Sequence, residues 1–346
     1  MINIKSLTKK QIIQYFIDNG EKTFKGQQVF KWLWQKHISD FDEMTDVSKK
    51  LREKLKSEFV IEYPKILKKQ ISKDGTIKYL LELNDGVAIE TVWIPSGRRN
   101  TICISTQAGC AMGCKFCYTA KQEFIRNLTF FEIVDQIIVI IKDLNKRPTN
   151  IVTMGMGEPL KNLENLEEAI GIINDETGIG IAARKITVST VGFIPGIYEL
   201  AKYPKQIKLA VSLNATNDKI RNYIMPINKI YPIEKLLYSV KHFIEIKGKR
   251  VTFEYVLIKG VNDSKDDADK LIELTKDIEC KINIIPLNVS INDVDSLFKP
   301  IDNETVEKFT KWMMKGHKAV TVRKSKGRDI DAACGELKGR ESLKNY

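Results

Sequence analysis

The sequence predicts an α/β fold, a partial (β/α)6 barrel that carries an N-terminal helical accessory domain and a short antiparallel β extension. The main observation is that strand-like runs alternate with helical patterns after Arg99. Such alternation predicts parallel strands joined by right-handed crossovers, and six units rather than eight predict a barrel open on one side. The six runs, and a last strand near the tail, are 101–106, 150–155, 186–190, 208–214, 251–258, 281–288 and 319–324.

The helical domain is predicted over residues 1–60. Thr8 can cap a first helix that ends at Asn19-Gly20, and two further helices have apolar faces around Val29 and Leu51. Lysines and one arginine interleave with aromatic residues over positions 25–54. This surface could bind RNA, or it could be a solvated polar face over an ordinary core.

The β extension is predicted over residues 61–98, where the hydrophobic period changes to two. Asp74-Gly75 and Asp85-Gly86 supply the turns of an antiparallel meander. On this pattern alone, Glu90 would be a solvated strand carboxylate. Residues 99–346 form the core, in which the clearest helix spans 129–144 and begins with a capping box from Thr129 to Glu132.

Composition and charge limit the setting of the protein. The chain of 346 residues starts without the apolar stretch of a signal peptide, and its longest aliphatic run, 137–141, is too short to span a bilayer. We therefore expect a cytoplasmic protein with no membrane association. The net charge of +12 favours a polyanionic partner, although a lysine-rich proteome produces the same excess.

The most informative motif is the Cx3Cx2C loop formed by Cys110, Cys114 and Cys117. Structural zinc needs four ligands, and a cubane cluster normally takes four thiolates. Three thiolates would leave one iron open to a cofactor, and the aromatic residue before the last cysteine fits the pattern of radical S-adenosylmethionine (radical SAM) enzymes. The alternatives are a reduced cysteine-rich turn and a zinc site completed from elsewhere in the chain.

Glycine-containing turns and mostly polar side chains follow the other predicted strands, where the functional groups of barrels collect. They could hold the ribose, amino and carboxylate groups of a cofactor, although each alone is a common hydrogen-bonding residue at a strand end. These candidate residues are Gly157, Glu158, Ser189, Ser212, Leu213, Asn214 and Asn288.

Two cysteines outside the loop could accept a methyl group or exchange disulfides near such a site. Cys103 lies on the first core strand, and Cys334 lies close to the C-terminus. Cys280 is interpreted as a buried structural residue.

Together, several ordered motifs make the chain resemble the RlmN/Cfr family of radical SAM RNA methyltransferases, nearly from end to end. They include segments 24–32, 103–110, 126–129, 155–160, 225–228, 260–263 and 329–335, with the cysteine loop among them.

The resemblance implies a 4Fe–4S cluster on Cys110, Cys114 and Cys117, and two SAM molecules per turnover. A first SAM methylates Cys334, and a radical generated from the second converts that methyl into a methylene radical that adds to an adenine. Glu90 would accept the displaced proton, and Cys103 would form a disulfide with Cys334 that releases the RNA. The implied partners are 23S rRNA, tRNA and an electron donor such as flavodoxin or ferredoxin, and we expect a monomer.

The family divides between methylation of adenine C2, in rRNA and in a tRNA anticodon loop, and methylation of C8, which confers antibiotic resistance. Pro159 and the segment 280–283 resemble the C2 branch. The sequence departs from the family pattern at two positions: Asn214 stands where the family usually has His, and Val289 stands where it usually has Pro. The competing hypotheses are a C8 methyltransferase and, in another class, an RNA-binding module that contains zinc.

Overall fold

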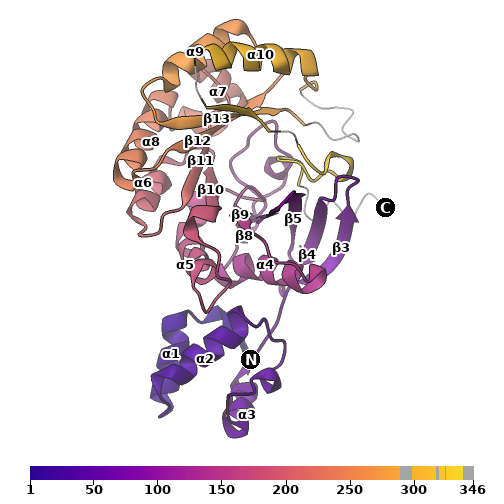
Figure 1. Cartoon of the computed structure of the whole chain (residues 1–346), viewed down its shortest axis with the longest axis vertical. Helices are drawn as coiled ribbons and strands as arrows, with labels where there is room; N and C mark the ends of the chain where they lie inside the picture. Colours follow the sequence, from indigo (N-terminus) through magenta and orange to yellow (C-terminus); the bar gives the residue numbers. More distant parts are fainter. Residues whose placement is uncertain (289–297, 317–318, 324, 338–346) are drawn as a thin grey trace.

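The computed structural model describes residues 1–288, 298–316, 319–323 and 325–337. One ten-stranded sheet forms its centre, in the order β14-β13-β12-β11-β10-β9-β6-β5-β4-β3. The described helices lie mainly around the outside of this curved sheet, and an N-terminal group of helices lies at one end (Figure 1).

Seven neighbouring strands of the sheet run parallel, which confirms the predicted α/β barrel architecture. They are β6 (Arg99–Cys103), β9 (Asn150–Val152), β10 (Ile186–Thr190), β11 (Lys208–Ser212), β12 (Val251–Leu257), β13 (Cys280–Pro286) and β14 (Val320–Val322). The crossovers contain α4 (Phe130–Leu144), α5 (Leu163–Asn174), α6 (Ile194–Lys202), α7 (Asp218–Ile224), α8 (Ile233–Lys247), α9 (Lys265–Thr275) and α10 (Asn303–Gly316).

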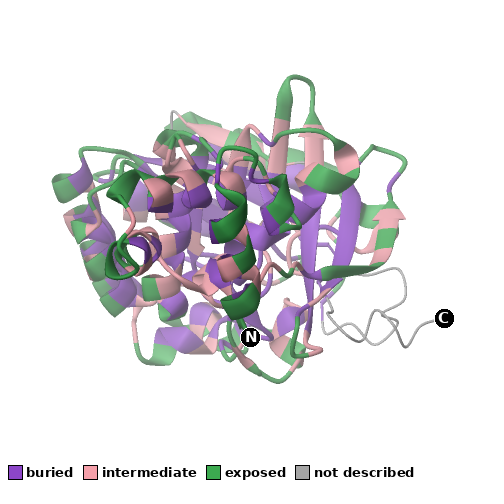
Figure 2. Ribbon diagram, turned by 90° about the horizontal axis from the view of Figure 1, so that it is seen from below, coloured by how far each residue is buried: buried purple, intermediate pink, exposed green. Residues whose placement is uncertain are grey.

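Helix α4 shows how the sequence determines these elements. Its predicted capping box is present, because the Thr129 N–H donates to the Glu132 carboxylate over 2.8 Å. The following aliphatic residues, including Ile133, Ile137 and Ile140, are completely buried against the sheet. Most residues of the central strands are likewise buried or half-buried, and exposed residues are found mainly on the outer faces of the helices and in the loops (Figure 2).

The antiparallel extension comprises β3 (Lys65–Ile71), β4 (Ile77–Glu82) and β5 (Ala88–Ser96). Because β5 also pairs antiparallel with β6, the extension continues the barrel sheet. The interpretation of Glu90 as a solvated carboxylate was wrong, since its exposed fraction is 0%. The C-terminal segment of the chain (residues 325–337) covers the face of β4 and β5 that carries Lys78 and Glu90. Lys78 donates to the Asp331 carbonyl of this segment.

The N-terminal helices are α1 (Lys9–Asp18), α2 (Thr23–Trp34) and α3 (Lys49–Glu58), and a short parallel pair, β1 (Ile2–Asn3) with β2 (Phe59–Val60), closes the unit. Thr8 caps α1 as predicted. The unit is joined to α4 by an ion pair of 2.6 Å between Lys5 and Asp135, whose side chains are 0% and 2% exposed.

The remaining strand pair, β7 (Gln107–Ala108) with β8 (Arg126–Asn127), encloses the base of the cysteine loop. Within the described residues, no helix is both long enough and apolar enough to span a membrane.

Candidate active site

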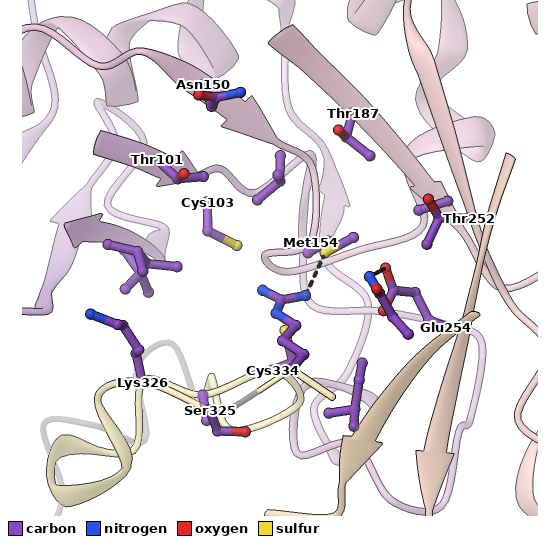
Figure 3. Close-up of a pocket in the computed structure, with 18 of the residues that line it drawn as sticks. Thr101, Cys103, Asn150, Met154, Thr187, Thr252, Glu254, Ser325, Lys326 and Cys334 are labelled. Carbon is purple, nitrogen blue, oxygen red and sulfur yellow. Dashed lines mark hydrogen bonds between the residues drawn. The ribbon is translucent and has the colours of Figure 1, made fainter. Parts of the chain in front are cut away.

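Two adjoining cavities occupy the inside of the barrel. The larger one, about 450 Å³, is lined by inward-facing side chains of the strands and by the C-terminal segment (Figure 3). The smaller one, about 150 Å³, lies where the parallel strands end and includes the cysteine loop. Five residues line both cavities: Met154, Glu254, Ile285, Arg323 and Cys334.

The structure brings the three loop cysteines to the smaller cavity. Gly109 begins the loop with φ +75°, and a Cβ there would lie 2.0 Å from the Glu123 carbonyl oxygen, so only glycine fits. The loop then folds on itself, with the Cys117 N–H donating to the Cys114 carbonyl over 3.1 Å. Apolar side chains such as Met225 pack around the loop and limit access of water.

The electrostatics of the loop favour an added cation. Burial raises the pKa of Cys110 to about 12, and burial together with the two neighbouring thiols raises the pKa of Cys114 well above its usual value. Three thiolates are therefore unfavourable here unless positive iron offsets their charge.

Across the described part of the chain, no group of three or more His, Cys, Asp or Glu side chains is arranged to hold a metal ion. A preformed site for a single zinc ion is thus not found among these residues, whereas in a cubane each thiolate binds a different iron. The three thiols on one apolar cavity wall fit such a cluster.

Four of the seven predicted cofactor-binding residues line the same small cavity: Gly157, Ser189, Ser212 and Asn288. Gly157 has φ +102°, and a Cβ there would lie 2.5 Å from Gln107 Cβ. This position therefore requires glycine. The Ser189 hydroxyl donates to the Thr153 carbonyl over 2.5 Å. The predicted convergence of strand ends thus brings these four residues together.

Glu158 does not belong to the described lining of this cavity, and its side chain fixes the loop that carries Gly157. Its two carboxylate oxygens accept backbone N–H bonds from Leu160, over 3.1 Å, and from Val191, over 2.8 Å. Burial raises the pKa of this carboxyl to about 7, while the bond from Val191 opposes the rise.

Leu213 and Asn214 also contact other parts of the protein rather than the cavities. Leu213 is completely buried in the core. Asn214 adopts the left-handed conformation at φ +56°, which asparagine tolerates well, and its Oδ1 accepts the Val256 N–H over 2.8 Å. Neither belongs to the described lining of the two cavities.

Cys103 and Cys334 face the larger cavity from opposite sides, one at the end of β6 and the other on the C-terminal segment (Figure 3). Burial raises the pKa of Cys103 to about 12, and the neighbouring Cys334 adds to this rise, whereas Arg323 opposes it. Arg323 lines both cavities and donates to the Met154 sulfur over 3.2 Å. Cys280 is buried in the hydrophobic core, as expected.

The segment that carries Cys334 is held from two sides. Ser72, in the turn after β3, donates to the Asp329 carboxylate over 2.5 Å. On the other side, the Tyr118 N–H, just after the cysteine loop, donates to the Gly335 carbonyl over 2.7 Å. Cys334 is therefore fixed between the β extension and the cysteine loop.

Sequence reasoning missed two charged residues of this site, Arg323 and Lys78. Lys78 is 4% exposed, and its Nζ lies 3.2 Å from Glu90 Oε1. Alternation along β5 puts Glu90 on the face of Val92, which lines the larger cavity. The hairpin turn at Asp85-Gly86 fixes the register, so the diagonal placement of Lys78 and Glu90 could have been derived from it.

Comparison with known proteins supports these observations over nearly the whole chain. Residues 2–61 match the ribosomal RNA large subunit methyltransferase N-terminal domain, and residues 104–275 match the radical SAM superfamily. A crystal structure of a radical SAM methyltransferase from Sphaerobacter thermophilus superposes with a TM-score of 0.91 at 38% identity, covering 97% of this chain and 99% of that one.

Curated relatives are equally similar in sequence. A protein of Bacillus velezensis named "Probable dual-specificity RNA methyltransferase RlmN" is 44% identical over 98% of this chain and 93% of its own. A protein of the same name from Thermoanaerobacter sp. is 42% identical over 99% of both chains. With relatives this close along its full length and a cysteine loop that opens into a strand-end cavity, the chain belongs to the RlmN family of radical SAM RNA methyltransferases.

Proposed function

We propose that this radical SAM RNA methyltransferase methylates C2 of one adenosine in 23S rRNA and of one adenosine in the anticodon loop of tRNA. The observation that carries the proposal is the position of Cys334. It lines both the cavity of the cysteine loop and the larger cavity in which Cys103 lies. A group transferred to Cys334 in the first cavity would therefore meet a base held in the second.

The small cavity suits the cofactors that radical SAM enzymes use. Cys110, Cys114 and Cys117 would hold a 4Fe–4S cluster, and SAM bound at its open iron would supply the radical chemistry. Gly157, Ser189, Ser212 and Asn288 would contact SAM because they line the same cavity. Glu158 and Asn214 would act as positioning residues, since their side chains fix the strand ends that carry these contacts.

Each step of the reaction is then assigned to a residue of the protein. Cys334 would carry a methyl group supplied by one SAM molecule and present it to the adenine, and a second SAM would supply the radical chemistry that activates this methyl. Glu90 accepts the proton from the methylated carbon. Cys103 would attack the sulfur of Cys334 as a thiolate. The S–S bond forms as the bond from that sulfur to the one-carbon unit breaks, and the carbon keeps the electron pair and takes up a proton, which releases the methylated RNA. This pairing is supported by the position of both cysteines on the wall of the larger cavity and by the influence of Cys334 on the pKa of Cys103.

Regiochemistry at C2 is supported by residues that line this cavity. Lys281 and Asn283, from the segment that resembles the C2 branch, are both on its wall and could contact the edge of the base. Asn214, which stands where the family usually has His, fits its position because asparagine tolerates the left-handed backbone found there. Val289, the other departure, lies outside the described residues. The main alternative is methylation at C8.

Further parts of the proposal concern the partners. Reduction of the cluster needs an electron donor such as flavodoxin or ferredoxin. Because ribosomal and transfer RNA are the substrates, the enzyme would act in the cytoplasm, and it would act as a monomer.

The test is methylation in vitro with the reconstituted enzyme, followed by chromatography of the nucleosides. The proposal expects 2-methyladenosine, and Cys334→Ala should form none. A product that co-elutes with 8-methyladenosine would overturn the C2 assignment and leave the radical mechanism standing. Absence of any methyladenosine from fully loaded enzyme would overturn the function.

A further inference from the structure

Lys78 is an unusual buried cation because it contacts two different parts of the site. Its side chain, on β4, is 4% exposed. Nζ lies 3.2 Å from Glu90 Oε1 on β5 and donates to the Asp331 carbonyl over 3.0 Å. Buried lysines are rare unless they are paired, and an ammonium group offers three donors for such contacts.

Strand register relates Lys78 to the reacting residues. Lys78 pairs with Val92, and Val92 in turn pairs with Cys103, so these residues form one row across β4, β5 and β6. Glu90 is one diagonal step away on the same face. The segment with Asp331 covers this face and continues to Cys334. Lys78 therefore links the carboxylate to the segment that carries the reactive sulfur.

We propose that Lys78 is a positioning residue that fixes the Glu90 carboxylate beside the base attached to Cys334. This inference rests on the proposed roles of Glu90 and Cys334. In the step concerned, the proton on the methylated carbon moves to a carboxylate oxygen, and the electron pair of the broken C–H bond stays with the ring. Removing the ammonium group takes away the positive charge and the donor that hold this buried carboxylate in place.

The proposal separates early from late steps of the reaction. Methylation of Cys334 does not need the carboxylate, and the segment keeps other anchors when Lys78 is removed. These include the bond between Ser72 and Asp329 and the bond from the Tyr118 N–H to the Gly335 carbonyl. We therefore expect Lys78→Met to form methyl-Cys334 and to bond covalently to RNA, yet to release product slowly.

The experiment uses the full-length, cluster-loaded enzyme with SAM, reductant and a 23S rRNA fragment. Mass spectrometry measures methyl-Cys334 and the protein–RNA adduct, and chromatography measures released methyladenosine. Lys78→Met should methylate Cys334 as the unchanged enzyme does, accumulate the adduct and lose release by about 10²-fold or more, the scale of general-base catalysis. Lys78→Arg should recover part of the release because it keeps the charge.

Controls identify the cause of any loss. Ser72→Ala loosens the same C-terminal segment without contacting Glu90, and it should not accumulate adduct. A parallel fall of Cys334 methylation and release in Lys78→Met would mean that the lysine is only structural, and would overturn the proposal. Where Lys78→Met fails to load the cluster, Lys78→Gln tests the charge with a polar donor retained.

Glu90→Gln separates this inference from the proposed function. If Glu90→Gln turns over normally, the proposed role of Glu90 is wrong and the inference fails with it. If Glu90→Gln accumulates adduct while Lys78→Met releases product like the unchanged enzyme, only the role of Lys78 is wrong.

Discussion

The buried ion pair between Lys5 and Asp135 allows a stability prediction with a defined magnitude. Lys5 Nζ lies 2.6 Å from Asp135 Oδ2, the side chains are 0% and 2% exposed, and Asp135 Oδ1 has no hydrogen-bond partner among the described residues. Lys5→Met leaves a carboxylate buried without its cation. Breaking such a pair from one side costs about 3–5 kcal/mol in the free energy of unfolding.

The pH dependence of this loss follows from the carboxyl. Burial raises the pKa of Asp135 to about 6, and Lys5 opposes the rise. An unfolded aspartate titrates near pH 4, so the folded state binds the proton more tightly, and stability falls as pH rises from about 4 through the folded pKa. Without Lys5 the folded pKa rises further. Lys5→Met should therefore lose less stability at pH 5, where Asp135 is largely neutral, than at pH 8.

The assay is urea unfolding at both pH values, followed by circular dichroism. Lys5→Met/Asp135→Leu should restore most of the lost stability, because no unpaired charge remains. Lys270→Met, which breaks an exposed ion pair with Asp266 on α9, should leave the unfolding midpoint unchanged. The reasoning is refuted by a Lys5→Met protein that loses less than about 1 kcal/mol at pH 8, or that loses the same amount at both pH values.

Further predictions concern the site and the RNA. Arg323→Met should slow release of RNA and accumulate adduct, because burial raises the pKa of Cys103 to about 12 and Arg323 opposes this rise. Alkaline pH should partly restore release by forming the Cys103 thiolate, and a defect that does not depend on pH would contradict this reasoning. Replacing Cys114 with Ala should abolish iron binding and SAM cleavage, and full iron and sulfide content in a variant lacking all three loop cysteines would exclude the cluster assignment. RNA affinity should fall by about 10³–10⁵-fold between low and moderate salt if 6–10 phosphates are contacted. Lys49→Glu/Lys50→Glu on α3 should reduce the slope of log affinity against log salt concentration by about 2. Lys265→Glu/Lys270→Glu on α9, at the other end of the molecule (Figure 1), should leave this slope unchanged. Equal effects of the two pairs would show that only net charge matters.

Local sequence signals predicted the fold well because they act over short distances. The capping box at Thr129 and the cap at Thr8 each involve residues three apart, and both are present. The apolar runs of the core strands were located to within a few residues, since their outward-facing residues are apolar and buried under the helices. The cysteine loop was recognised from its spacing alone.

What the sequence did not reveal depends on contacts between distant segments. Glu90 was interpreted as solvated because nothing near it in the sequence indicates that residues 325–337 cover β4 and β5. The side chain of Glu158 turns inward because the Leu160 and Val191 N–H groups lie there, and only the folded turn shows this. Arg323 acquires significance only when Cys103 and Cys334 lie beside it.

The N-terminal unit illustrates a similar limit. From the sequence, removal of residues 1–60 is expected to weaken RNA binding and leave the cluster intact. The structure shows that this deletion also removes Lys5 from the buried Asp135 on α4. Charge reversal on α3 is therefore the cleaner test of RNA binding, because it leaves the contact with α4 unchanged.

The most direct test of the account is the fate of the RNA in Cys103→Ala. If Cys334 carries the one-carbon unit to adenine and Cys103 releases it, this variant should stop with RNA covalently attached. Digestion and tandem mass spectrometry should then find adenosine linked through one carbon to the peptide that contains Cys334. Normal turnover by Cys103→Ala, or an adduct mapped to another residue, would contradict the account.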